Sequence, residues 1–196
     1  MLCERGLSRA CRRFRVTDMS RMRVALPLLV GLFSIWSAAQ AVPRDLGTIG
    51  IKAIVNDVDS HLKRFNESRT MLQTGTDRGG ELTIYRKGSD IVRIDATIGG
   101  SNSDLHDVFY YSGANPIFVR TKTLTYPYSS TSDGFDFAAP HVKAAADYYV
   151  RDGKLVPLSR AKIAASLESR LLQEAELFMA AGRQGTRVVD IEKLVK

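Results

Sequence analysis

The sequence predicts an α+β domain: an antiparallel β-meander of five to seven strands, with an N-terminal helix and a longer C-terminal helix packed on one face. Three observations lead to this prediction. Apolar residues recur at three- and four-residue steps in two segments, as they do along one face of a helix. Between these segments the apolar pattern changes to a period of two, which is typical of strands. Short glycine-containing connections separate the alternating segments, as in hairpins.

The first helical segment runs from Ile51 to Phe65. Its apolar positions are three or four residues apart, with one adjacent pair: Ile51, Ile54, Val55, Val58, Leu62 and Phe65. Charged residues take the other faces, which fits a helix lying on a core. We expect this helix to end near Arg69, before the polar loop at residues 74–80.

The alternating segments pair into three predicted hairpins. They join 81–86 to 90–97 through Lys87-Gly88-Ser89, 108–111 to 117–125 through residues 112–116, and 144–151 to 154–157 through Asp152-Gly153. Glycine suits such turns because it adopts positive φ without steric cost. Hairpins that follow one another along the chain predict a meander.

A second helix is expected after Pro157, with Ser159 as its N-cap and Gly182 as its stop signal. Its apolar positions are three or four residues apart: Ile163, Leu167, Leu171, Ala175 and Phe178. The tail at residues 186–196 forms either an edge strand or a short last helix.

Residues 1–41 are predicted to be a signal peptide, and residues 42–196 a single globular domain. Positive charges at Arg21 and Arg23 precede an apolar run that ends at Trp36, and Ala39-Gln40-Ala41 matches the A-x-A cleavage pattern. The run is shorter than the ~20 residues of a membrane span, so no anchor is expected after cleavage. Because residues 1–20 are long for an ordinary signal, Met19 or Met22 is the expected true start.

Removal of this segment changes the charge and the redox chemistry. Seven of the 28 Lys and Arg residues and two of the 21 acids precede Val42, which leaves 21 bases, 19 acids and a net charge of +2. No basic cluster of the kind that binds nucleic acid remains. Both cysteines, Cys3 and Cys11, lie in the removed part. A thiol-free exported domain favours a bacterial periplasmic or secreted protein.

The predicted hairpins share a weak motif. Tyr85 and Tyr110 each lie three residues before a turn glycine, and Tyr149 lies four before Gly153. This spacing resembles the aromatic-x-x-Gly hairpins of MORN-like meanders and of uncharacterised bacterial periplasmic proteins. The resemblance covers about half of residues 42–196. It implies an open antiparallel sheet and carries no activity with it.

Catalytic chemistry has few candidates. Asp104 and His106 lie on one side of an extended chain, and Asp107 follows, so His106 with Asp104 or Asp107 is a candidate acid–base group. Asp57 and His61 share a helix face, but two ligands do not make a metal site, and no metal is predicted. No phosphate-binding loop, dinucleotide fingerprint or zinc-helix motif occurs, so no cofactor is predicted.

Aromatic residues are the strongest functional observation. The loop at residues 126–140 carries Tyr126, Tyr128, Phe135 and Phe137, and it either is held by these rings or presents them to a partner. Tyr111 and Tyr148 lie in aromatic runs that occupy both faces of their strands. One face packs on the helices; the other is a candidate recognition surface, or is stabilised by cross-strand pairs.

The sequence therefore favours a non-enzymatic binding or accessory protein of the bacterial envelope, acting on a protein or hydrophobic partner through the open sheet face and the 126–140 loop. Two alternatives remain: a small periplasmic hydrolase using His106, and a carrier of a lipid or other hydrophobic ligand.

Overall fold

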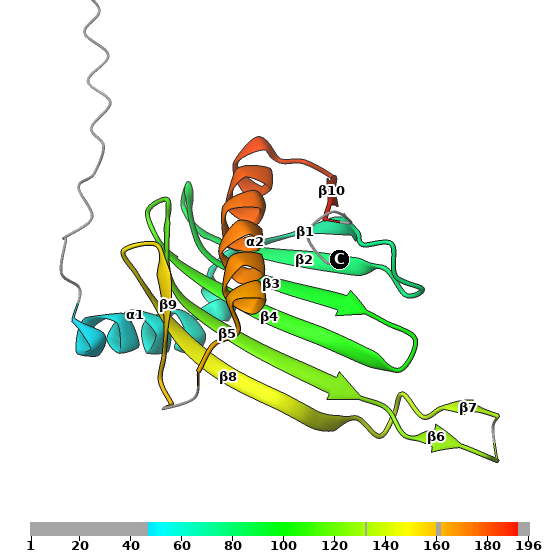
Figure 1. Ribbon diagram of the computed structural model, residues 1–196. Coiled ribbons are helices and arrows are strands. Elements are labelled where there is room, and N and C mark those ends of the chain that lie inside the picture. The colour runs from blue at the N-terminus through cyan, green and yellow to red at the C-terminus, as the bar shows by residue number, and fades with distance from the viewer. Residues whose placement is uncertain (1–46, 132, 160–161, 192–196) are drawn as a thin grey trace, which may run out of the picture. The chain divides into compact units, whose positions relative to one another are not determined.

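The computed structural model describes residues 47–131, 133–159 and 162–191 (Figure 1). The predicted signal peptide lies outside these residues. The elements in chain order are α1 (Thr48–Ser60), the 3-10 helix η1 (Leu62–Arg64), β1 (Asn66–Gln73), β2 (Gly80–Lys87), β3 (Asp90–Gly99), β4 (Ser103–Ser112), β5 (Asn115–Thr125), β6 (Tyr128–Ser129), β7 (Gly134–Phe135), β8 (His141–Arg151), β9 (Lys154–Pro157), α2 (Ala165–Gln184) and β10 (Val188–Asp190).

The main sheet has eight strands in the order β10-β1-β2-β3-β4-β5-β8-β9. All neighbours are antiparallel except β10, which runs parallel to β1. The three predicted hairpins are present, and their turn glycines Gly88, Gly113 and Gly153 have φ values of 64°, 61° and 68°. The α+β meander is therefore confirmed, with more strands than the five to seven expected.

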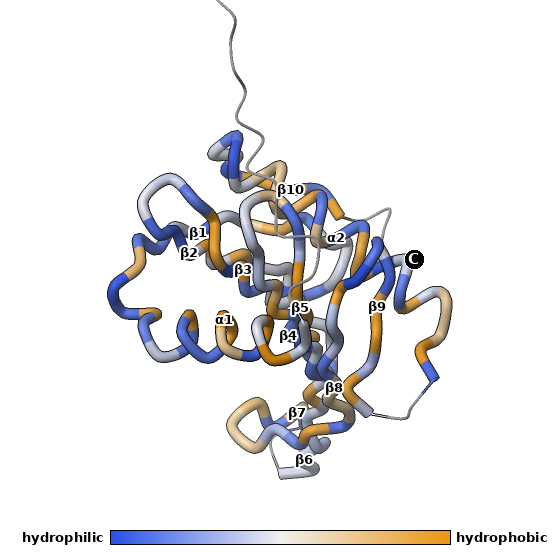
Figure 2. The backbone as a smooth tube through the Cα atoms, turned by 90° about the vertical axis from the view of Figure 1, so that its left-hand side faces the viewer, coloured by the Kyte–Doolittle hydropathy of each residue, from blue (hydrophilic) through white to orange (hydrophobic). Residues whose placement is uncertain are grey.

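The two helices lie on opposite faces of the sheet, and not on one face as predicted. Neighbouring residues of β4 show the division: Phe109 belongs to the core under α2, whereas Tyr110 belongs to the core under α1. Consecutive strand residues point to opposite sides, so these cores lie on the two faces. Figures 1 and 2 show α1 and α2 on either side of the strands.

The larger core lies under α2. Phe178 of α2 meets Phe109 edge to face at 5.6 Å between ring centroids, and both rings are fully buried. The helix also approaches the sheet at Gly182, where an added Cβ would lie 2.7 Å from Cδ1 of Ile91. In a core packed this closely, adding or removing a single methylene group changes the stability of the fold.

On the other face of the sheet, a network of arginine, aspartate and tyrosine side chains holds the C-terminal end of α1 against the strands. Arg93 donates to Asp59 of α1 at 2.7 Å, and Tyr110 donates its hydroxyl proton to the same carboxylate at 2.7 Å. Burial and then the hydrogen bond to Asp59 raise the pKa of Tyr110. Arg120 joins the network through Asp59 and Asp147 at 3.5 and 3.2 Å.

The first helix is shorter than predicted. It ends at Ser60, and residues expected to continue it as far as Arg69 form η1 and β1 instead. β1 lies near the edge of the sheet and buries only Thr70 and Leu72. With so few buried positions, its sequence shows no alternating apolar pattern.

The second helix also has different ends from those predicted. It begins at Ala165 after Ala164, so Ser159 lies in the preceding connection and does not cap it. Gly182 lies inside the helix, where it permits the close approach to Ile91. Gly185, with φ of 64°, is the left-handed residue that ends the helix. After it, the tail forms the edge strand β10, one of the two expected alternatives.

The outer edge of β8 is largely uncovered. β9 pairs only with Tyr148–Arg151, and among the described residues no other strand pairs with the outer edge from His141 to Ala146. The pairing with β5 shifts by one residue between Ala144 and Val142, which leaves Lys143 as an extra residue, a β-bulge.

Replacing Phe178 with alanine should lower the free energy of unfolding by about 3–5 kcal/mol, because it opens a cavity against Phe109. Urea unfolding followed by circular dichroism measures the change. Ile49→Ala, at a side chain that is 86% exposed, is the matched control and should change stability by less than about 0.5 kcal/mol. Equal effects of the two substitutions would contradict the assigned core.

Candidate functional site

The 126–140 segment forms a small hairpin that projects beyond the end of the main sheet (Figure 1). Its strands β6 and β7 pair Tyr128 with Phe135 and Ser129 with Gly134. The rings of Tyr128 and Phe135 meet edge to face at 5.8 Å, and the Tyr128 hydroxyl donates to Asp133. Below them, the Asp136 amide donates to the Pro127 carbonyl at 2.9 Å. The hairpin therefore has its own internal order.

The base of the hairpin is clamped to the main sheet by a group of four side chains, the hairpin clamp: Arg78, Asp104, Tyr126 and Phe137. Arg78 Nη1 donates to Asp104 Oδ1 at 2.8 Å, and the Tyr126 hydroxyl donates to Asp104 Oδ2 at 2.5 Å. The hydrogen bond to Asp104 and burial raise the pKa of Tyr126. The Arg78 guanidinium lies 4.2 Å from the Phe137 ring centroid, within the range of a cation–π contact.

Several aromatic and aliphatic side chains of this part of the chain are exposed to solvent. Tyr128 is 59% exposed and Phe137 is 47% exposed, while Tyr126 and Phe135 are half-buried. Val142, two residues after the segment, is 56% exposed. Tyr128 lies in β6, Phe137 follows β7 and Val142 lies in β8, so the exposed apolar side chains belong to one stretch of the chain. Contiguous exposed apolar surface is typical of interaction sites. The 126–140 segment thus holds its rings in place and also presents two of them to solvent.

Two of the predicted binding residues lie elsewhere. Tyr111 and Tyr148 are buried in the core under α2, and the Tyr111 hydroxyl donates to the Ala175 carbonyl at 2.9 Å. Burial raises the pKa of both phenols. Because helices cover both faces of the sheet at these strands, neither ring is available to a partner.

The three catalytic candidates are not brought together. Asp104 is engaged in the hairpin clamp. His106 Nδ1 lies 3.3 Å from the Thr97 hydroxyl, and its buried Nε2 has no hydrogen-bond partner among the described residues. Asp107 points to the opposite face, where Arg170 of α2 donates to it at 2.9 Å. Among the described residues, no hydrogen bond joins His106 to Asp104 or to Asp107.

Metal-binding geometry is also lacking among the described residues, where no group of three or more His, Cys, Asp or Glu side chains could hold an ion. Asp57 and His61 pair at 3.1 Å on the surface of α1. His141 lies exposed at the start of β8. In the same part of the chain, no helix combines the length and apolar character needed to cross a membrane.

A buried acidic cluster joins α2 to the sheet, and the sequence analysis missed it. Arg170 Nη1 donates to Asp107 Oδ2 and Glu174 Oε1, each at 2.9 Å. Both carboxylates are almost fully buried, and Asp107 Oδ1 has no hydrogen-bond partner among the described residues. Burial, reinforced by the Asp107 charge, raises the pKa of Glu174 to about 7, although Arg170 opposes the shift.

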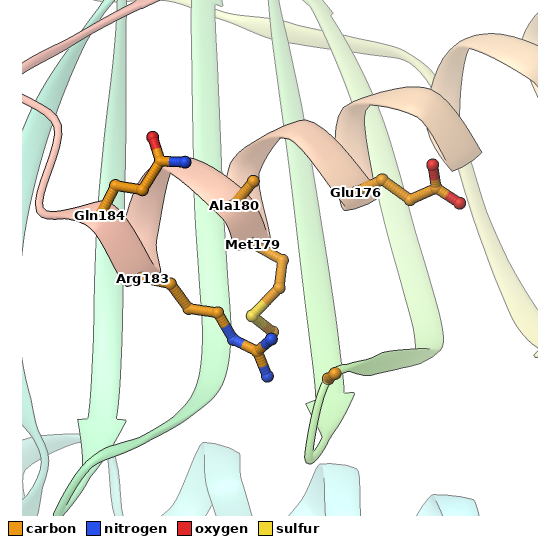
Figure 3. Close-up of a pocket in the computed structure, with 6 residues that line it drawn as sticks. Glu176, Met179, Ala180, Arg183 and Gln184 are labelled. Carbon is orange, nitrogen blue, oxygen red and sulfur yellow. The ribbon is translucent and has the colours of Figure 1, made fainter. Parts of the chain in front are cut away.

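A hollow of about 340 Å³ lies between the C-terminal half of α2 and the β4–β5 turn (Figure 3). Met179 and Arg183 point toward the turn, where Ala114 completes the lining. None of the residues predicted to form a site lines this hollow.

Comparisons with protein-family models, curated proteins and solved structures find no match to this chain. The resemblance to MORN-like meanders therefore stays a prediction.

Replacing Arg78 with methionine should loosen the hairpin, because Asp104 would keep only its hydrogen bond to Tyr126. We expect faster amide hydrogen exchange in the 126–140 segment, unchanged exchange in β3, and a loss of about 1–2 kcal/mol in the free energy of unfolding. Arg69→Met, which removes exposed ion pairs with Glu67 of β1 and Glu81 of β2, is the control and should leave the hairpin amides unchanged. Equal exchange in both variants would contradict the clamp.

Stability should fall as pH rises from about 4.5 to 7. In this window folded Glu174 holds a proton that the unfolded chain has released, since its folded pKa is about 7 against an unfolded value of 4.5. The contribution is on the order of 2–3 kcal/mol. Urea unfolding at several pH values measures it, and Glu174→Gln should lose this part of the pH dependence. Parallel profiles for the two proteins would show that Glu174 is not responsible.

Proposed function

We propose that this chain is an exported binding or accessory protein of the bacterial envelope, and that the β6–β7 hairpin is its contact element. The observation that supports this proposal is the pair of exposed rings, Tyr128 and Phe137, on a hairpin clamped by Arg78 and Asp104. Aromatic side chains give a large contact area for few rotatable bonds. A hairpin that is ordered before it binds loses little further entropy in the complex.

The partner that fits this surface is a protein with an apolar pocket or groove. Tyr128, Phe137 and Val142 supply apolar area, while Asp133 and Asp136 place carboxylates among the rings. These acids disfavour an anionic membrane surface, because like charges repel. Exposed aromatic residues surrounded by polar groups are typical of the energetic centre of a protein interface.

The hydrolase alternative receives no comparable support. Asp104 is held by Arg78 and Tyr126, and Asp107 is bonded to Arg170 of α2 on the opposite face from His106. A general base needs to reach the proton that it removes, and the Nε2 atom of His106 is buried.

The proposal is tested by capture of partners from an envelope extract of the native cell, with quantitative mass spectrometry. The unchanged protein should enrich a specific partner, and the double variant Tyr128→Ser, Phe137→Ser should recover at least tenfold less of it. The matched control is Met71→Ser, which removes a 67% exposed apolar side chain from β1 and should leave capture unchanged.

Two outcomes would contradict the proposal. One is equal capture of the partner by the hairpin variant and the unchanged protein. The other is the absence of any enriched protein after chemical crosslinking in the living cell. Circular dichroism of each variant establishes that the fold is intact before the captures are compared.

A further inference from the structure

A groove of about 410 Å³ lies along the flank of α1, on the face of the sheet opposite α2. This volume is within the range of sites that hold small organic ligands, roughly 300–1,000 Å³. Its lining comes from α1, from the residue before β1, and from β2, β3 and β4: Ala53, Ile54, Asp57, Val58, Phe65, Lys87, Val92 and Tyr111.

The groove is mainly apolar. Five of its eight lining residues contribute aliphatic or aromatic side chains on this face of the sheet: Ala53, Ile54, Val58, Phe65 and Val92. Tyr111 borders the groove, but its side chain lies in the core under α2, where the hydroxyl donates to the Ala175 carbonyl. Ile54, Phe65 and Val92 pack against the core under α1 but remain only half-buried. Part of the apolar surface of that core is therefore open to water along the groove.

The two charged residues of the lining are not equivalent. Asp57 is in contact with His61, the residue that follows α1, at 3.1 Å between Oδ1 and Nδ1, and this contact is an ion pair when His61 is protonated. Lys87, at the exposed end of β2, forms no ion pair with any described residue. The groove therefore combines an apolar floor with an ammonium group that pairs with no carboxylate in the described part of the chain. An alkyl chain that ends in one negative charge is complementary to both features.

We propose that this groove binds a monoanionic amphiphile, of which a medium-chain fatty acid is the simplest example. The alkyl chain lies on Ile54, Phe65 and Val92, and the carboxylate contacts Lys87. This role is separate from the contact element on the β6–β7 hairpin. It develops the alternative function of a hydrophobic-ligand carrier by naming the class of ligand and its binding site.

Isothermal titration of the purified protein with hexanoate, octanoate and decanoate, each below its micelle concentration, tests the proposal. Binding should be saturable with one site per chain. Affinity should rise by up to about fourfold for each added methylene, the factor for full burial of that group. Absence of saturable binding by decanoate would overturn the proposal.

The carboxylate contact is tested by Lys87→Met. Affinity for decanoate should fall about two- to fivefold, as expected for an exposed ion pair, while affinity for the neutral analogue decanol should be unchanged. Lys143→Met on β8 is the matched control. Equal effects of Lys87→Met on decanoate and on decanol would refute the contact with Lys87.

A second variant blocks the groove without disturbing the core. Ala53 is exposed on α1, so Ala53→Phe should preserve the fold, fill the groove and reduce decanoate affinity at least tenfold. Asn56→Phe, at an exposed position of the same helix that does not line the groove, should bind normally. Unchanged affinity in a folded Ala53→Phe protein would place the ligand elsewhere.

The hairpin variant Tyr128→Ser, Phe137→Ser should bind decanoate with unchanged affinity. This measurement separates the groove proposal from the proposal that the hairpin is a contact element.

Discussion

Burial on both faces of the central strand β4 is the constraint on which the rest of the structure depends. Phe109 and Tyr111 face α2, and Tyr110 between them faces α1, with all three rings almost completely buried. A sheet that carries large apolar side chains on both sides requires a cover on each, so the two helices separate. Because α1 has only thirteen residues, it covers a limited part of its face, and the groove lies along its flank.

The local parts of the fold could be predicted from the sequence, whereas the parts set by tertiary contacts could not. Alternating residues and turn glycines are neighbours in the chain, so the pattern of the sequence predicts the hairpins. β1 was not predicted, because a strand near the edge of the sheet with one solvated face needs few apolar residues. The role of Gly182 depends on Ile91, which is distant in the sequence and reaches it only when α2 packs on the sheet.

The candidate site shows the same division. Asp104 was predicted as an acid–base candidate, and Tyr126 and Phe137 as aromatic residues of the loop. Their contact with one another also involves Arg78, an arginine in a polar loop with no distinguishing pattern. Tyr111 and Tyr148 were misplaced because alternation alone does not show whether the second face of a strand is covered. The four-residue spacing of Arg170 and Glu174 could have indicated an ion pair, but not its burial against Asp107.

The bulge at Lys143 affects how readily two copies of this chain could pair at the edge of the sheet. A long strand with free amide and carbonyl groups invites another molecule to extend the sheet, which is the first step toward fibrils. The extra residue on β8 breaks the regular spacing of the amide and carbonyl groups, so they do not match the hydrogen-bond register of a regular strand. The small side chains of residues 144–146 also offer such a strand little apolar area. The ammonium group of Lys143 adds repulsion toward a second copy. A bulge and a lysine at an unpaired edge are both features that oppose the pairing of one sheet with another.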